Sequence, residues 1–324
     1  MLIPNWNSKK YIAECIESIV NQTYSNFEII LIDNASTDNS VELVRERYPF
    51  VRIIQNITNL GFAGAVNIGI ENASGKLVAI LNQDAYADKD WLNHLVSVVC
   101  ESDTIGAAAG KAYYWRDERQ REDVFCTWSK VDPYTANVYN FSDNEPTSKV
   151  DYVTGAGMMV NKDVIRKVGY LDTEYFLYFD ETDWCARMIR ARYDLVYVPD
   201  AIIWHVVSSS ISNPELKQYF MTRNRIRFAL KNFDVRYIPG FMLFFAVETA
   251  RLLFRRRVRL GLTETKIRLT AVWWNVLNLP NTLRARRRDI GLISRALGKI
   301  EPYNESLPLK EYKIGMVERF LSKL

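Results

Sequence analysis

The chain has 324 residues, of which 48% are hydrophobic and 25% are charged. This length accommodates one large α/β domain plus an appended unit, and the apolar content is that of a globular protein with a sizeable core, which excludes general disorder. The four cysteines are far apart and include no CxxC pair, which argues against a disulfide framework or a zinc module and favours a reduced, cytoplasmic compartment. The first ten residues lack the basic and apolar regions of a signal peptide, so none is expected.

The net charge of +4 is unevenly distributed along the chain. From Lys217 to Arg288 there are 17 lysines and arginines but only three acids, so the remainder is acidic on balance. An acidic body followed by a basic segment indicates two functions on one chain. We therefore predict a domain at residues 1–212 and a basic helical region at residues 213–324.

The first hundred residues alternate short apolar runs with helical patterns. The apolar runs predict buried strands at Met1–Ile3, Phe27–Ile32, Val51–Ile54 and Leu77–Leu81. Apolar residues three and four apart predict helices at Lys10–Val20, Ser40–Arg47, Gly61–Glu71 and Asp90–Cys100. This alternation predicts an α/β fold with a mostly parallel sheet covered on both faces. Ligands of such sheets bind beyond the carboxyl ends of the strands, which here are followed by Pro4–Lys9, Asp33–Asn39, Asn56–Gly64 and Asn82–Asp88.

The second half of this domain is less regular. Residues Lys111–Lys149 are polar and aromatic, and they predict an excursion from the core. The domain is then completed by a strand, two helices and two further strands at Tyr152–Val160, Lys162–Val168, Asp180–Ala191, Asp194–Val198 and Ala201–His205.

Three polar residues, Asn82, Gln83 and Asp84, directly follow the apolar strand that ends at Leu81. A carboxylate at the ligand-binding edge of the sheet can hold Mg²⁺ or Mn²⁺, which take oxygen ligands and bridge diphosphate oxygens. The same three residues also suit a polar strand end that caps the next helix. The segment alone therefore leaves both interpretations open.

A second candidate site is the acidic cluster Asp180, Glu181 and Asp183, which follows an aromatic run. Apolar flanks desolvate a carboxylate and raise its pKa towards the working range of a general base. Acids in the first turn of a helix are also favoured by the helix dipole alone. His205 ends an apolar strand that leads into the hydroxyl-rich Ser208–Ser210, where a metal or phosphate could be met, whereas His94 is expected to be a core residue.

The segments Asp33–Asp38 and Asn59–Asn67 contain small and polar residues at the same predicted edge. Gly61 and Gly64 allow close approach of the backbone, and the helix that begins there offers free N–H groups to an anion. The segment is neither GxGxxG nor a P-loop, which excludes the dinucleotide-binding and P-loop interpretations.

The order of these motifs resembles that of the family 2 glycosyltransferases of the GT-A fold, and most closely that of their rhamnosyltransferase-like group in bacteria and archaea. The resemblance covers about two-thirds of the chain, from Met1 to about Ser210. It rests on Ile3–Asn7, Asp33–Asp38, Asn59–Asn67, Leu81–Asp84, Gly155–Gly157, Phe179–Asp183 and Trp204–His205.

The resemblance implies a role for each matching position. The donor nucleotide would be bound by Pro4, Asn5, Asp33, Asn59, Gly61, Asn67, Asn82 and Gln83. Asp84 matches the last aspartate of the family's metal-binding DxD motif, and His205 matches the histidine that completes the shell of Mg²⁺ or Mn²⁺. Because Asn82 replaces the first aspartate, Asp84 is the only carboxylate of this motif.

The catalytic base of the family falls on Glu181. Aspartate is common at this position, so the neighbouring Asp180 remains a rival. The resemblance implies an inverting transferase that moves a sugar, rhamnose or another hexose, from a nucleoside-diphosphate donor to a hydroxyl of a glycan or lipid-linked acceptor. One alternative is a nucleotidyltransferase, although Pro4–Lys10 lacks the Gly-rich basic loop that normally opens those enzymes. The other alternative is a non-catalytic carbohydrate-binding relative, because one DxD aspartate is missing.

The basic helical region mixes arginines with leucines and aromatic residues. Its apolar run Ile238–Ala250 is too short and too polar to span a bilayer. Helices with arginine on one face and Trp, Phe and Leu on the other lie in the membrane interface, and anionic lipid attracts them. The composition therefore predicts a peripheral protein on the inner face of the cell membrane, and the alternative is a helical subdomain whose arginines are solvated or paired internally. No nucleic-acid partner is expected, because no recognition module is evident.

Overall fold

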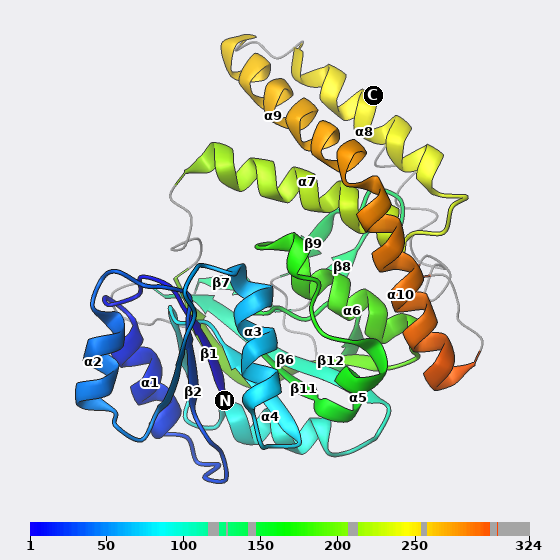
Figure 1. Ribbon diagram of the computed structural model, residues 1–324. Helices are drawn as coiled ribbons and strands as arrows, with labels where there is room; N and C mark the ends of the chain where they lie inside the picture. The colour runs from blue at the N-terminus through cyan, green and yellow to red at the C-terminus, as the bar shows by residue number, and fades with distance from the viewer. Residues whose placement is uncertain are drawn as a thin grey trace.

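The computed structural model describes residues 1–115, 123–127, 129–141, 147–206, 213–253, 258–298 and 303. These residues form a central sheet with helices on both faces and a group of helices stacked beyond one side of it (Figure 1). The predicted boundary at residue 212 and the Ser208–Ser210 turn lie outside the described residues.

The central sheet is mixed but mainly parallel, as predicted. Along its main path the strands are β10 (Ser148–Val150), β12 (Asp194–His205), β6 (Ile105–Tyr114), β11 (Gly157–Asn161), β4 (Leu77–Leu81), β1 (Leu2–Asn5), β2 (Ile30–Asp33) and β3 (Arg52–Gln55). Strand β1 is parallel to β2 and β4, β2 is parallel to β3, and β12 is parallel to β6. Strand β11 is antiparallel to both of its neighbours.

Four short strands lie outside this path. Strand β5 (Ala85–Ala87) pairs antiparallel with β12, and β7 (Val124–Cys126) pairs with β6. Strands β8 (Ser129–Val131) and β9 (Val138–Asn140) form a separate hairpin within the segment that we predicted to leave the core.

Helices cover both faces of the sheet because alternate strand residues point to opposite sides. Leu2 and Ile80 belong to one apolar core, and Ile3 and Leu81 belong to the other. The first core is covered by α3 (Gly61–Asn72), α5 (Lys162–Val168) and α6 (Asp180–Arg190). The second is covered by α1 (Ile12–Val20), α2 (Ser40–Arg47) and α4 (Trp91–Val99).

Strands β6 and β12 depart from the sequence predictions for identifiable reasons. Strand β6 was not predicted, because its residues are mainly alanine and glycine, which are weak strand formers, and it extends into the predicted excursion. Strand β12 is continuous where we predicted two strands, at Asp194–Val198 and Ala201–His205. A register shift against β6 between Val198 and Ile202 accommodates the intervening proline and aspartate without ending the strand.

The basic region forms α7 (Pro214–Asn232), α8 (Ile238–Leu253), α9 (Val258–Leu277) and α10 (Leu279–Leu297) in the part of the chain that the structure describes. Helix α7 lies between the sheet and the α8–α9 pair, and α10 runs back beside α5 and α6 (Figure 1). Phe228 and Phe241 of this region join the same core as α3 and α6. No helix among the described residues is long and apolar enough to cross a membrane.

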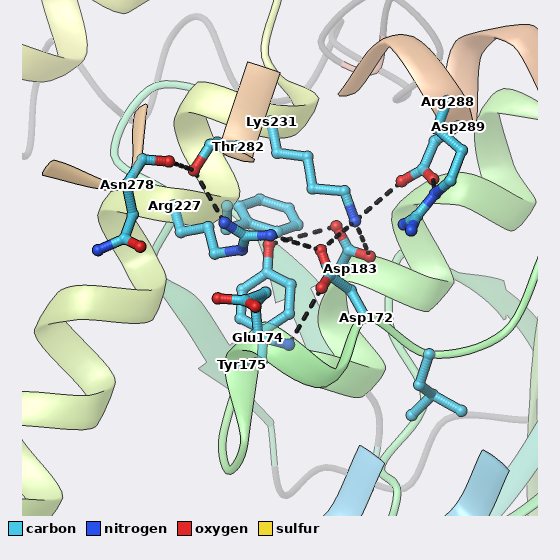
Figure 2. Close-up of polar contacts among 12 residues, drawn as sticks. Asp172, Glu174, Tyr175, Asp183, Arg227, Lys231, Asn278, Thr282, Arg288 and Asp289 are labelled. Atoms are coloured by element: carbon cyan, nitrogen blue, oxygen red, sulfur yellow. Dashed lines mark hydrogen bonds and ion pairs between the residues drawn. The ribbon is translucent and has the colours of Figure 1, made fainter. Parts of the chain in front are cut away.

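A buried ionic cluster joins α6 to α7 and α10 (Figure 2). Three acids face three bases in it: Asp172, Asp183, Asp289, Arg187, Arg227 and Lys231. The Lys231 ammonium lies 2.8 Å from carboxylate oxygens of Asp183 and Asp289 and 2.9 Å from one of Asp172. Burial alone would raise the pKa of Asp183, but Lys231 and Arg187 hold it below its ordinary value.

We predict that Lys231→Met lowers the free energy of unfolding by about 3–5 kcal/mol, because three buried carboxylates then share only two buried bases. Urea unfolding followed by circular dichroism measures this difference. The matched control is Arg236→Met, whose ion pair with Asp234 is largely exposed and is expected to contribute about 1 kcal/mol or less. Equal losses for the two variants would show that the cluster does not hold the helices together.

Candidate active site

A pocket of about 420 Å³ lies at the carboxyl ends of β1, β2 and β4, where the sequence predicted ligand binding. Four polar loops, an aromatic loop and the start of α7 contribute to its wall. The lining residues are Pro4, Asn5, Trp6, Asn34, Asn59, Gly61, Phe62, Asn82, Gln83, Asp84, Phe176, Leu177, Asn213, Leu216 and Phe220.

Two of the predicted donor-binding residues, Asp33 and Asn67, do not line this pocket. Asp33 is 1% exposed and does not line the pocket, and its carboxylate accepts a 2.7 Å hydrogen bond from the Asn5 amide. Asn67 exchanges two hydrogen bonds, of 2.9 and 3.0 Å, with the backbone of Leu171. In this structure both residues therefore support neighbouring segments rather than facing the cavity.

A reciprocal pair joins the ends of β1 and β4. The Gln83 side chain donates to the carbonyl oxygen of Trp6 at 3.0 Å and accepts from the Trp6 backbone N–H. Because Gln83 is buried and Trp6 is 38% exposed, the pair fixes the two loops while leaving the indole at the pocket. The Asn82 amide, which also lines the pocket, turns towards His205 instead.

Gly61 begins α3 and can be replaced by no larger residue without strain. Its φ is +72°, and a methyl group added there would lie 2.2 Å from the carbonyl oxygen of Phe176. That oxygen accepts a 2.9 Å hydrogen bond from the Phe62 N–H, and Asn59 accepts one from Gly61 at 2.8 Å. The glycine thus allows the loop that contains Phe176 to approach the first turn of α3.

The structure brings Asp84 and His205 together, although 121 positions separate them. Pairing of β5 with β12 places Ala85 opposite His205, and the neighbouring Asp84 carboxylate lies 3.2 Å from the His205 Nε2. The Asn82 amide lies 3.3 Å from the same nitrogen. A carboxylate and an imidazole at a buried edge are suitable ligands for a divalent cation such as Mn²⁺.

Few protein side chains at this position could serve as metal ligands. Across the described ranges, no group of three or more His, Cys, Asp and Glu side chains is arranged to hold a metal. The His205 Nδ1 is buried and has no hydrogen-bond partner among the described residues. A cation held by Asp84 and His205 would therefore need further ligands from its substrate or from water.

The two candidate bases at the start of α6 are in different environments. Asp180 is 2% exposed, and burial followed by the neighbouring Glu181 carboxylate raises its pKa well above the ordinary value, which favours its protonated form. Glu181 is half-buried and accepts a 2.8 Å hydrogen bond from the Tyr152 hydroxyl. A methyl group added at Gly155 would contact both Glu181 and Phe62, so Glu181 is next to a residue of the pocket wall.

Comparison with known proteins agrees with the motif order. Residues 1–169, more than half of the chain, match the family model described as Glycosyl transferase family 2. The chain belongs to glycosyl transferase family 2. An uncharacterized glycosyltransferase of Haemophilus influenzae is 37% identical over 110 residues, which are 33% of this chain and 34% of that protein. Glycosyltransferase AglE of Haloferax volcanii is 26% identical over 212 residues, which are 63% and 66% of the two chains.

The fold of this family 2 glycosyltransferase is also similar to that of a solved relative. The mannosyltransferase PcManGT from Pyrobaculum calidifontis, solved with GDP-Man and Mn²⁺, superposes with a TM-score of 0.54 at 16% identity. The match covers 85% of this chain and 86% of that one. The predicted GT-A fold is thereby confirmed, and family membership sets aside the nucleotidyltransferase alternative.

Several residues of the glycosyltransferase pocket were missed in the sequence. Asn213, Leu216 and Phe220 belong to the region that we had separated from the catalytic domain. Phe220 stacks on Phe176, with ring centroids 5.5 Å apart and planes at 20°. Local patterns do not reveal which distant helix covers a sheet edge, and the aromatic run before Asp180 was the only available signal.

Proposed function

We propose that this protein is a metal-dependent, inverting glycosyltransferase that moves a hexose, with rhamnose among the candidates, from a nucleoside-diphosphate donor to an acceptor hydroxyl. The observation that carries the proposal is the pairing of Asp84, which lines the sheet-edge pocket, with His205. Such an edge is where α/β folds bind nucleotides. The complex of PcManGT with GDP-Man and Mn²⁺ supports a nucleotide-sugar donor and a divalent cation.

The pocket wall suits the two parts of such a donor. Trp6, Phe62 and Phe220 offer apolar surface to a base or sugar ring, and Asn59 offers an amide group beside it. Helix α3 begins at Gly61, and although the N–H groups of Gly61 and Phe62 are already hydrogen-bonded, the positive end of the helix dipole favours an anion nearby. The diphosphate would then lie between this helix and Asp84.

Asp84 and His205 would hold Mg²⁺ or Mn²⁺, and the diphosphate oxygens would supply further ligands. When bound, the cation neutralises the charge that grows on the departing nucleoside diphosphate. Asp84 would orient the donor by this contact, and the pocket aromatics would exclude water from the anomeric carbon.

Glu181 would take the proton from the acceptor hydroxyl. It is half-buried and shares Gly155 as a neighbour with Phe62, whereas Asp180 is buried and its raised pKa favours the protonated form. The Tyr152 hydroxyl donates to one oxygen of Glu181 and would hold that carboxylate in place for the proton transfer. A single displacement needs no covalent nucleophile and inverts the anomeric configuration.

The α8–α9 pair would bring this site to a membrane surface. Its exposed apolar residues are Met242, Leu243, Leu262, Leu269, Trp273, Val276 and Leu277. Arg251 and Lys266 are exposed on the same two helices. Other bases of the region pair internally, such as Arg225 and Arg268 with Glu248, so fewer charges reach the surface than the sequence count indicates. Shallow insertion of the apolar side chains, with attraction of the bases to anionic lipid, would suit a lipid-linked acceptor.

Asp84→Asn tests the metal and the reaction together. In the wild type, one nucleotide sugar of a UDP-, GDP- and dTDP-sugar panel should raise the melting temperature with Mn²⁺ and release its nucleotide on transfer. The variant should lose roughly 10²-fold or more in turnover, because the cation loses a carboxylate ligand. Asp90→Asn is the control, since Asp90 accepts from Thr23 on the surface. Wild-type turnover by Asp84→Asn at limiting Mn²⁺ would contradict the assignment.

Glu181→Gln is expected to lower kcat by roughly 10²–10⁴-fold while leaving the KM for the donor nearly unchanged, because only proton transfer is lost. Asp180→Asn replaces an acid whose raised pKa favours the neutral form by a neutral isostere, and it should retain activity within about tenfold. Steady-state transfer assays at neutral pH compare the two. If Asp180→Asn shows the large loss and Glu181→Gln does not, the roles are exchanged.

Liposome sedimentation tests the membrane surface. We expect pelleting with vesicles that contain anionic lipid, weaker pelleting at high salt, and little with neutral vesicles. Trp273→Asp should reduce binding, whereas Phe50→Asp, at an equally exposed aromatic residue (62%) far from the α8–α9 pair, should not. Equal and negligible pelleting with both vesicle types would leave the region as an ordinary helical subdomain.

A further inference from the structure

The loop that leads into α6 has an unusual backbone. Phe176, Tyr178 and Phe179 all have positive φ angles, of 63°, 66° and 68°. Aromatic side chains are rarely found in this conformation, which persists only when the surrounding structure imposes it. The Phe176 carbonyl oxygen accepts its hydrogen bond from Phe62 of α3, outside the loop. The loop therefore depends on donors supplied from elsewhere.

Asn224 of α7 supplies these donors. Its side chain is 0% exposed, and its Nδ2 lies 2.9, 2.8 and 2.7 Å from the carbonyl oxygens of Tyr175, Leu177 and Tyr178. One buried amide thus contacts three carbonyl groups of the strained loop. Without it, these oxygens would be buried with fewer partners, which disfavours the observed conformation.

Arg223 orients this amide. Its Nε donates to the Asn224 Oδ1 at 2.8 Å, which leaves the Nδ2 facing the loop. The same guanidinium donates to the carbonyl oxygens of Glu174 and Tyr175 at 2.8 and 2.7 Å. It also packs over the ring of Trp274, 4.4 Å from the centroid. The pair of residues therefore forms a rigid bracket that is fixed by α7 and α9.

The bracketed loop touches both halves of the candidate active site. At one end, Phe176 lines the pocket, and its carbonyl oxygen accepts the Phe62 N–H. At the other end, Phe179 precedes the first residues of α6, among them Glu181. Any relaxation of the loop therefore moves the pocket wall relative to Glu181.

We propose that Asn224, oriented by Arg223, is a positioning residue that sets the placement of Glu181 against the donor pocket. The inference rests on the proposed glycosyl transfer, because it assigns the role of the bracket in that reaction. It makes the basic region part of the catalytic apparatus: α7 carries the bracket and also part of the pocket wall. A misplacement of about 1 Å at a reacting group can cost roughly 10²-fold in rate.

The test compares Asn224→Ala with Asn275→Ala in the full chain. Asn275 is also a buried amide (3% exposed), and it joins α9 to α7 by donating to the Arg223 carbonyl oxygen, but it makes no contact with the loop. Both variants lose a buried hydrogen-bonding group, so both should lower the melting temperature. Only Asn224→Ala should loosen the segment from Phe176 to Asp183.

Two readouts separate positioning from general stability. Amide hydrogen exchange of residues 176–183 should rise at least about tenfold in Asn224→Ala and stay near wild type in Asn275→Ala, because only the first variant frees the loop. The kcat for transfer should fall by roughly 10–100-fold while the KM for the donor changes by less than about threefold. Arg223→Lys, which loses the fork geometry but keeps the charge, should change both readouts in the same direction and provides a second variant if Asn224→Ala does not fold.

Equal exchange of the loop in the two asparagine variants, or equal losses of kcat, would overturn the inference. A wild-type protein that transfers no sugar would instead refute the proposed function. The exchange measurement does not depend on turnover, so the bracket itself would still be tested.

Discussion

The backbone carbonyl groups of the loop before α6 must find hydrogen-bond donors, and most of the site depends on this requirement. The donors are the side chains of Arg223 and Asn224 on α7. About two turns further along α7, the buried cluster around Lys231 joins α6 to α7 and α10 through opposite charges. Two separate polar contacts thus fix α7 against α6. With α7 in place, Phe220 can stack on Phe176 and complete the pocket.

Sheet pairing provides the second constraint on the site. The parallel strands β1, β2 and β4 end at one edge, and their polar loops meet there. Asp84 and His205 meet because β5 pairs with the end of β12. Each contact joins residues far apart in the chain, and each is decided by backbone pairing. The side chains at this edge can therefore differ between relatives while the position of the site is retained.

Much of the fold could be predicted because its first half is built from local patterns. Helix α2, helix α5 and strand β4 begin and end where their apolar spacing predicts, and the loops after the strands do converge on one pocket. Strand β6 escaped prediction because alanine and glycine carry little strand signal. The contribution of α7 could not be predicted, because the sequence of a helix shows which face is apolar but not which element that face packs against. The burial of Lys231 and Arg227 escaped it because charge counts do not distinguish solvated bases from paired ones.

Anomalous scattering tests most directly whether the pocket closed by α7 is the donor site. The crystal would contain the full chain, Mn²⁺ and the nucleoside diphosphate of the preferred donor. We predict one strong manganese peak between the Asp84 carboxylate and His205, with the diphosphate beside it and the nucleoside within the wall that contains Trp6 and Phe220. Manganese and nucleotide bound elsewhere, such as at the opposite end of the parallel strands, would contradict this assignment of the site.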